Sequence, residues 1–170
     1  MRPGGDQTAD SIQLGADERG FTIRAVGHIR ANNCFSLREE LFPELESAPP
    51  ELEFFMDLSG CTYMDSTFIG LLVAMDKRIG RHGGKRLRLM NPTPECTDSL
   101  HRLGLDRVLV IEKSSGPFPL PVAMRSLSKT EKPGAEFILK THEALMETSA
   151  EAKKKFSLVM ELLAKKLRGE

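Results

Sequence analysis

Apolar residues in the first two thirds of the chain recur with two different periods. Phe21, Ile23 and Ala25 alternate with polar residues, which is the period-2 pattern of a half-buried strand. Residues 52–58 (LEFFMDL) are almost continuously apolar and too few for a buried helix, so they predict a central strand, which a turn at residues 59–61 follows. The same reasoning predicts further strands over residues 12–14, 85–90 and 108–111.

Segments with the three- to four-residue spacing of helices separate these strands. Ser36 and Glu39 form an S-x-x-E pair, which predicts a capping box at the start of a first helix that ends before Pro49. A second amphipathic helix is predicted over residues 68–79, and Thr93, followed by a proline, predicts the cap of a third. Alternating strands and helices are typical of a mainly parallel β-sheet packed against α-helices, so we expect an α/β fold.

The chain changes character after residue 113. Four prolines and several serines in the next stretch predict a partly extended linker. Beyond it, helical spacing returns and predicts one long helix or a helical hairpin. Its apolar stripe is thin and is interrupted by His142 and Ser149, so we expect it to dock on the core, on a second copy or on a partner. The expected division is a domain over residues 10–113, a Pro-rich linker over 114–134 and a C-terminal helical extension over 135–170.

Composition and charge narrow the classes of function. Lys and Arg balance Asp and Glu at 24 residues each, so no overall positive field favours direct binding of nucleic acid or of an anionic membrane. No apolar run approaches the roughly 20 residues of a membrane-spanning helix, and the N-terminal residues lack the apolar region of a secretory signal. We therefore expect a cytoplasmic protein without membrane insertion.

The three cysteines and four histidines do not have the spacing of a metal site. Reduced cysteine side chains inside a core are the simpler interpretation, because a free cysteine packs as a small apolar residue. We expect no metal and no cofactor.

Residues 63–67 (YMDST) lie where the central strand ends and the second helix begins. We expect Ser66 at the N-cap, where its hydroxyl lies near free backbone N–H groups and the positive end of the helix dipole. A phosphate on Ser66 would be stabilised there, and beside Asp65 it would add a charge of about −1.5 to −2 without unfolding the domain. On position alone, the simpler interpretation is that Ser66 only caps the helix.

Three motifs together resemble the STAS domain of bacterial anti-sigma factor antagonists. They are the strand ending in Asp57-Leu58-Ser59, the segment Met64-Asp65-Ser66-Thr67 at the start of a helix, and Asn91-Pro92 before a helix ending in Leu103-Gly104-Leu105. The resemblance extends from about residue 10 to about residue 112, and it implies the STAS fold for this part of the chain.

In that family the serine matching Ser66 is phosphorylated by a partner kinase that is also the anti-sigma factor, and a PP2C-type phosphatase reverses this. The unphosphorylated protein binds the kinase and frees the sigma factor. The resemblance therefore implies a phosphorylation-switched regulator of transcription with these two proteins as partners.

The resemblance also implies a partner-binding surface around Ser66. It is expected to include Asp65, Thr67, Phe68, His28 and Ile29. Asp65 is expected to cap the helix or to orient the serine hydroxyl, and Thr67 is an alternative acceptor of phosphate. Many members have a glycine where this chain has Phe68, a difference that bears on the choice of partner.

Other classes of function fit these residues less well. An enzyme with Ser66 as nucleophile is disfavoured, because the G-x-S-x-G pattern is missing and no histidine can be assigned as the base from spacing. A carrier protein with a prosthetic group on Ser66 is disfavoured because such carriers are helical and acidic. The main alternative is a STAS scaffold or adaptor, stressosome-like or transporter-associated, without a phosphoswitch. The sequence leaves a homodimer open.

Overall fold

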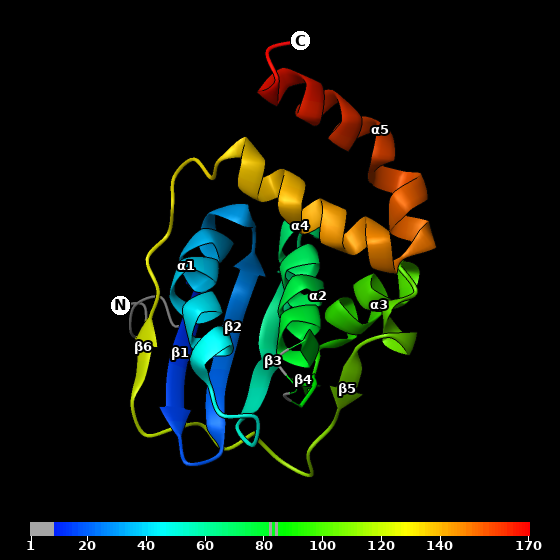
Figure 1. Cartoon of the computed structure of the whole chain (residues 1–170). Coiled ribbons are helices and arrows are strands. Elements are labelled where there is room, and N and C mark those ends of the chain that lie inside the picture. The colour runs from blue at the N-terminus through cyan, green and yellow to red at the C-terminus, as the bar shows by residue number, and fades with distance from the viewer. Residues whose placement is uncertain (1–8, 82, 84) are drawn as a thin grey trace, which may run out of the picture.

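A six-stranded sheet forms the centre of the computed structural model, which describes residues 9–81, 83 and 85–170 (Figure 1). The strands are β1 (Ser11–Asp17), β2 (Gly20–Ile29), β3 (Glu53–Met64), β4 (Leu87–Met90), β5 (Val110–Glu112) and β6 (Met124–Ser126). Their order is β5-β4-β3-β2-β1-β6. Strands β2 to β5 pair in parallel, whereas β1 pairs antiparallel with β2 and with β6. The predicted α/β fold with a mainly parallel sheet is confirmed, and residues 1–8, which bear on the secretory-signal prediction, lie outside the described part.

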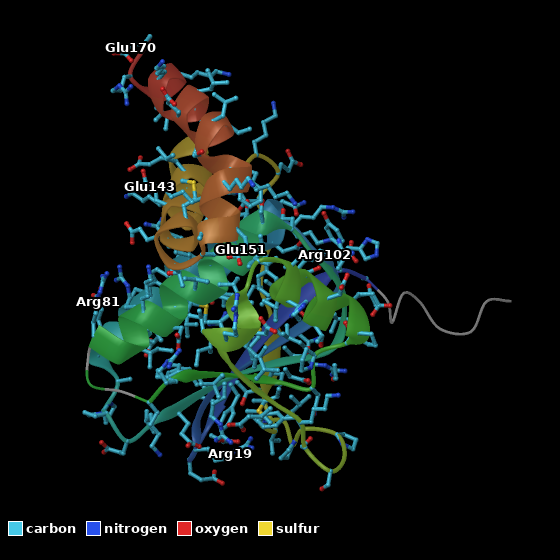
Figure 2. The ribbon with its side chains drawn as sticks, turned by 90° about the vertical axis from the view of Figure 1, so that its right-hand side faces the viewer. Arg19, Arg81, Arg102, Glu143, Glu151 and Glu170 are labelled. Carbon is cyan, nitrogen blue, oxygen red and sulfur yellow. The ribbon has the colours of Figure 1, made fainter. Side chains whose placement is uncertain are left out.

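Five helices accompany the sheet in the described part of the chain. They are α1 (Ala31–Ser47), α2 (Ser66–Arg81), α3 (Pro94–Arg102), α4 (Ala135–Thr148) and α5 (Ala150–Leu167), and a short 3₁₀ turn covers Leu105–Arg107. Helices α1 and α2 lie side by side on one face of the sheet, and α4 crosses over them (Figure 1). We call α4 and α5 together the C-terminal hairpin; its far end, at Glu170, projects away from the sheet (Figure 2).

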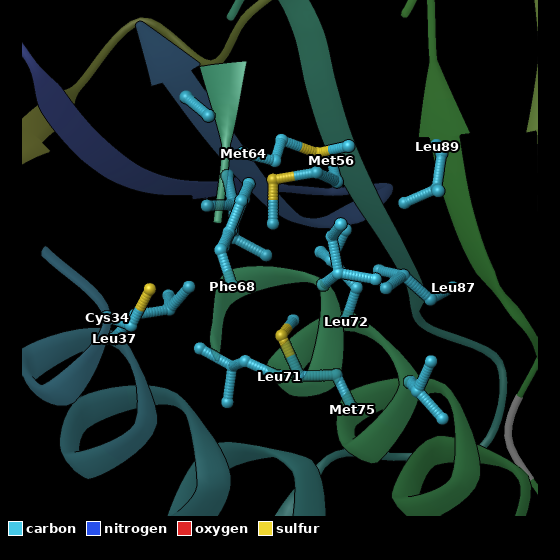
Figure 3. Packing of buried hydrophobic residues seen from close by; sticks show 14 of the residues in the cluster. Cys34, Leu37, Met56, Met64, Phe68, Leu71, Leu72, Met75, Leu87 and Leu89 are labelled. Carbon is cyan, nitrogen blue, oxygen red and sulfur yellow. The ribbon is translucent and has the colours of Figure 1, made fainter. Parts of the chain in front are cut away.

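The main core lies between α2 and the middle strands. Phe68, Leu72 and Met75 of α2 are fully buried and point towards Met56 of β3 and Leu87 of β4 (Figure 3). Burying a side chain of this size stabilises the fold by about 1.5–3 kcal/mol. This core holds the beginning of α2 firmly against the end of β3.

A smaller cluster covers the opposite face of the sheet. Phe55 follows Phe54 and precedes Met56, so its side chain points to the other face. It packs with Met90 and with Phe118, whose ring centre lies 4.9 Å from that of Phe55. The linker after β5 therefore contributes to packing on this side.

The prediction of a capping box at Ser36 is wrong. Helix α1 begins earlier, at Ala31, and the Asn33 side chain accepts a hydrogen bond from the backbone N–H of Arg30 (3.0 Å). Ser36 lies inside the helix, buried, with its hydroxyl 3.1 Å from that of Ser128. Local spacing misplaced the helix start because Asn33 supplies, six residues earlier in the chain, the bond that the predicted box assigns to Glu39.

The predicted turn at residues 59–61 is also wrong, because β3 continues through these residues to Met64. The neighbouring β2 extends beside it, with Val26 opposite Gly60 and His28 opposite Tyr63, and pairs with it through two shifts in register. Pairing with β2 thus carries the chain directly to the start of α2.

The linker is partly structured. Residues 124–126 form β6, an edge strand on β1, and the backbone N–H of Leu127 donates to the carbonyl of Ile12 (2.8 Å). Of the two predicted forms of the extension, the hairpin is the one observed, and it docks on the core. Within the described ranges, we found no helix with the length and apolar character that crossing a membrane requires.

Candidate functional site

The candidate site lies where β3 ends and α2 begins. The backbone N–H of Asp65 donates to the carbonyl of Ile29 at the end of β2 (3.0 Å), and the helix starts at the next residue, Ser66. Two neighbouring parallel strands therefore fix the position of this corner.

Asp65 caps two helices at once. Its Oδ1 accepts from the backbone N–H of Phe68 in α2 (2.8 Å), and its Oδ2 accepts from the N–H of Ala31 in α1 (2.9 Å). Ser66 is thus the first residue of α2, and the prediction that it occupies the N-cap is wrong. A carboxylate accepts both bonds better than a hydroxyl can, which explains why Asp65 takes this place.

Two opposed effects act on the pKa of the Asp65 carboxyl. Burial raises the pKa of its carboxyl above the ordinary value, because the charged form loses solvation. The N–H groups of Phe68 and Ala31 lower this pKa, as does the positive charge of the nearby His142 when its ring is protonated. Asp65 is therefore a cap whose charge is held partly away from water.

Ser66 is paired with a histidine from the C-terminal hairpin. The Ser66 Oγ lies 2.7 Å from Nε2 of His142, and Nδ1 of His142 lies 2.8 Å from the carbonyl oxygen of Ile138. Because a carbonyl only accepts, Nδ1 of a neutral His142 carries the proton and Nε2 accepts from the Ser66 hydroxyl. The serine hydroxyl points at α4.

The histidine itself is held in place by packing. His142 is only 4% exposed, and the ring of Phe156 from α5 meets it edge-on with the ring centres 5.2 Å apart. Ser149, the N-cap of α5, donates from its hydroxyl to the carbonyl of Leu103 at the end of α3 (2.6 Å). Both helices of the hairpin are thereby fastened near Ser66.

A cavity of about 330 Å³ opens beside Ser66. The residues that line it come from the β3–α2 corner, from α3 and from α5, and they include Asp65, Ser66, Ser99, Arg102, Lys155 and Phe156. Arg102 pairs with Asp98 one helical turn earlier (2.6 Å), and both side chains are exposed. The Lys155 amino group lies 5.4 Å from the centre of the Phe156 ring.

The residues expected at the partner-binding surface divide into two groups. His28 is exposed, with its ring centre 5.6 Å from that of Tyr63, and Asp65 is half-buried. In contrast, Ile29 and Phe68 are fully buried and Thr67 is 4% exposed. These three side chains offer no surface to a partner in this structure, and they fix the backbone beneath Ser66.

Sequence reasoning missed the contribution of the hairpin to this site. His142, Phe156 and Lys155 are more than 70 residues from Ser66 in sequence, and no local motif joins them to it. The one signal was that His142 and Ser149 interrupt an apolar stripe. A polar residue at such a position needs a buried hydrogen-bond partner, and both residues have one.

All three cysteines are buried, and none forms a disulfide. Among residues 9–81, 83 and 85–170, we found no group of three or more His, Cys, Asp or Glu side chains placed to hold a metal ion.

Comparison with protein families gives a match over residues 12–112 to the family described as "Mlab, STAS domain". The chain belongs to the STAS domain family. The matched part of the STAS domain runs from β1 to β5, so it contains Asp65 and Ser66, whereas β6 and the C-terminal hairpin lie beyond it. A search of curated proteins found no match.

Solved structures share the fold of this STAS domain. The anti-sigma factor antagonist SpoIIAA in its unphosphorylated form is 19% identical, with a TM-score of 0.54 over 62% of this chain and 89% of SpoIIAA. The protein TM1081 is 22% identical, with a TM-score of 0.53 over 59% of this chain and 79% of its own. An anti-sigma-factor antagonist (STAS) domain protein from Planctomyces limnophilus is 22% identical, with a TM-score of 0.50 over 62% of this chain and 91% of its own. Identities this low establish the fold alone.

Proposed function

We propose that this protein is an anti-sigma factor antagonist whose binding to a serine-kinase anti-sigma factor is switched by phosphorylation of Ser66. The observation that carries the proposal is the position of Ser66 as the first residue of α2, directly after the strand β3 of a STAS domain. The similarity in fold to an anti-sigma factor antagonist known in an unphosphorylated form supports it.

The proposed chemistry takes place on the partner. Oγ of Ser66 attacks the γ-phosphorus of a nucleoside triphosphate held by the kinase, the bond to the leaving nucleoside diphosphate breaks, and the hydroxyl proton passes to a base. A PP2C-type phosphatase would return the serine by hydrolysis, with water as the co-reactant and inorganic phosphate as the product. The STAS protein is the substrate in both directions, and we propose a cytoplasmic location for this cycle.

The helix start can accommodate the charge. A phosphate of about −1.5 to −2 charge beside Asp65 changes the surface that the exposed His28 borders, while the caps of α1 and α2 remain. Because Ile29, Thr67 and Phe68 are buried, the proposed docking surface consists of His28, Asp65 and Ser66, with the three buried residues as support.

The Ser66–His142 pair reopens the question of catalysis, since it supplies the base that sequence spacing did not. A serine nucleophile also needs N–H donors for the developing oxyanion. The N–H of Phe68, one of the nearest candidates, is taken by Asp65. We therefore propose that Ser66 accepts phosphate and is not a catalytic nucleophile.

The test is intact-mass and peptide mass spectrometry of the protein from its native cells, with and without phosphatase treatment. We expect a phosphate on Ser66, distinguished from Thr67 by fragmentation, that phosphatase removes. The Ser66→Ala form should then retain a kinase that the Ser66→Asp form loses. An unmodified Ser66 under both growth and stress would contradict the switch and favour the scaffold or adaptor role.

A further inference from the structure

The cavity beside Ser66 brings together two cationic side chains from different parts of the chain. Arg102 comes from the end of α3 in the STAS domain, and Lys155 comes from the first turns of α5 in the C-terminal hairpin. The carbonyl of Leu103, the residue after Arg102, accepts a hydrogen bond from the hydroxyl of Ser149 at the start of α5 (2.6 Å). The cavity therefore exists only while the hairpin is docked.

The immediate surroundings of Ser66 restrict the direction of a group attached to its oxygen. Towards α4 the way is closed, because Nε2 of His142 lies 2.7 Å from Oγ, a separation that accommodates only a hydrogen atom. His142 is fixed in turn by the carbonyl of Ile138 and by the Phe156 ring. The cavity that Ser66 lines is an open side on which a phosphate can lie.

The charges around the cavity suit an anion. Asp65 is the acidic residue among those that line it, and both of its carboxylate oxygens already accept backbone N–H groups. Arg102 and Lys155 have exposed side chains, so each can turn towards a phosphate, and Arg102 can exchange its pairing with Asp98. Charge-assisted hydrogen bonds to phosphate are about twice as strong as neutral ones.

We propose that this cavity binds the phosphate carried by Ser66, with Arg102 and Lys155 as its cations, and that phosphorylation thereby fastens the C-terminal hairpin to the STAS domain. The inference rests on the proposed function, since it concerns what happens to the phosphate once it is attached. Phosphorylation removes the hydroxyl proton that Ser66 donates to Nε2 of His142. The ion pairs of the phosphate with Arg102 and Lys155 outweigh the loss of that hydrogen bond. In the phosphorylated form the hairpin stays on α2, so the face of the domain that α4 covers remains closed to partners. The hairpin thus binds the phosphate on Ser66 within the same molecule.

The test uses the full chain with phosphoserine installed at position 66 by genetic encoding. The second ionisation of the phosphate, followed by ³¹P NMR, should have a midpoint roughly half a unit below its ordinary value of about 6, because Arg102 and Lys155 favour the dianion. Lys155→Gln should move the midpoint back up. Lys154→Gln is the matched control, since Lys154 is exposed in the same helix turn but does not line the cavity.

Hydrogen exchange gives an independent readout. The amides of residues 150–160 should exchange more slowly in the phosphoserine protein than in the unmodified one, and Lys155→Gln should remove the difference. Equal midpoints for Lys155→Gln and Lys154→Gln, or faster exchange in α5 on phosphorylation, would overturn the proposal. The kinase plays no part in this experiment. If Ser66 is never phosphorylated in cells, the proposed function is wrong. The measurements on the phosphoserine protein would still show whether the cavity binds the phosphate.

Discussion

At the scale of single residues, Asp65 determines the geometry of the site. It caps α2 through Phe68 and α1 through Ala31, and its backbone N–H is bound to the carbonyl of Ile29 at the end of β2. One side chain therefore joins the two helices that cover the sheet at the place where Ser66 is presented.

Replacing Asp65 tests this role. Asp65→Ala leaves two N–H groups without acceptors, so we expect the free energy of unfolding, measured with urea, to fall by about 1–2 kcal/mol, in the range of a lost helix cap. Asp65→Asn keeps one acceptor oxygen and should lose less. Equal stability of the alanine variant and the wild type would show that the double cap contributes nothing.

The asparagine variant also reports on the ionisation of Asp65. Because burial raises its pKa in the folded state, the folded protein holds this proton more tightly than the unfolded chain does. The stability of the wild type relative to Asp65→Asn should therefore decrease as the pH rises from 3.8, the ordinary value, through the raised pKa. An increase over that range would mean that the hydrogen bonds to Asp65 outweigh its burial.

The position of Ser66 at a strand-to-helix corner was predictable, because apolar periodicity changes there from strand to helix. Its pairing with His142 was not. That contact depends on the angle at which α4 crosses α2, which is set by packing between segments that are far apart in sequence. Sequence spacing carries no information about such a crossing.

At the scale of elements, the close approach of α4 to α2 depends on one glycine. A Cβ atom added to Gly70 would lie 2.3 Å from the carbonyl oxygen of Thr141, which is far inside van der Waals contact. Gly70 lies one turn after Ser66, at a position where α4 packs closely against the backbone of α2. This approach places His142 within reach of the serine.

We expect Gly70→Ala to loosen the C-terminal hairpin. The added methyl group must push α4 outwards, so the melting temperature should fall and hydrogen exchange within residues 135–148 should accelerate. Gly80→Ala is the control in the same helix, because a Cβ there meets nothing within 4 Å. It should stabilise the protein by about 0.5–1 kcal/mol through helix propensity. Similar effects of the two substitutions would refute the close-packing argument.

The elements that periodicity predicted well are those whose burial is regular. The middle of β3 and the α2 helix have continuous or amphipathic apolar patterns, and both lie where expected. The error at Ser36 arose because another capping pair, Arg30 and Asn33, lies earlier in the chain. The error at residues 59–61 arose because the turn signal of a glycine was outweighed by the pairing of β3 with β2. The edge strand β6 had no periodic signal, because a three-residue strand is too short to carry one.

At the scale of the whole molecule, the C-terminal hairpin is part of the same core as the sheet domain. Phe137, Leu145 and Ala152 are buried in the main cluster, and the Phe137 ring meets that of Phe35 in α1 edge-on at 5.5 Å. The hairpin therefore covers apolar surface that α1 and α2 would otherwise expose to water.

A chain ending at residue 134 tests this coverage. We expect it to unfold at a lower urea concentration, with a loss of several kcal/mol, because the faces of α1 and α2 beneath α4 become exposed. A doubled molecular mass in solution would indicate that a second copy replaces the missing hairpin on that surface. Unchanged stability together with an unchanged mass would rule out a packing role for the hairpin.

The edge strand β6 affects how a partner could compete with the C-terminal hairpin for the surface of α1 and α2 beneath α4. It fixes the linker to β1, so only residues 127–134 separate an anchored point from the start of α4. Eight residues span at most about 29 Å, so a released hairpin stays within that radius of its site. Such a tether gives an effective concentration in the millimolar range. A partner that binds beneath α4 thus competes with the tethered hairpin, which dilution cannot remove. The apparent affinity of the partner is lowered as the equilibrium between docked and released hairpin shifts towards the docked form.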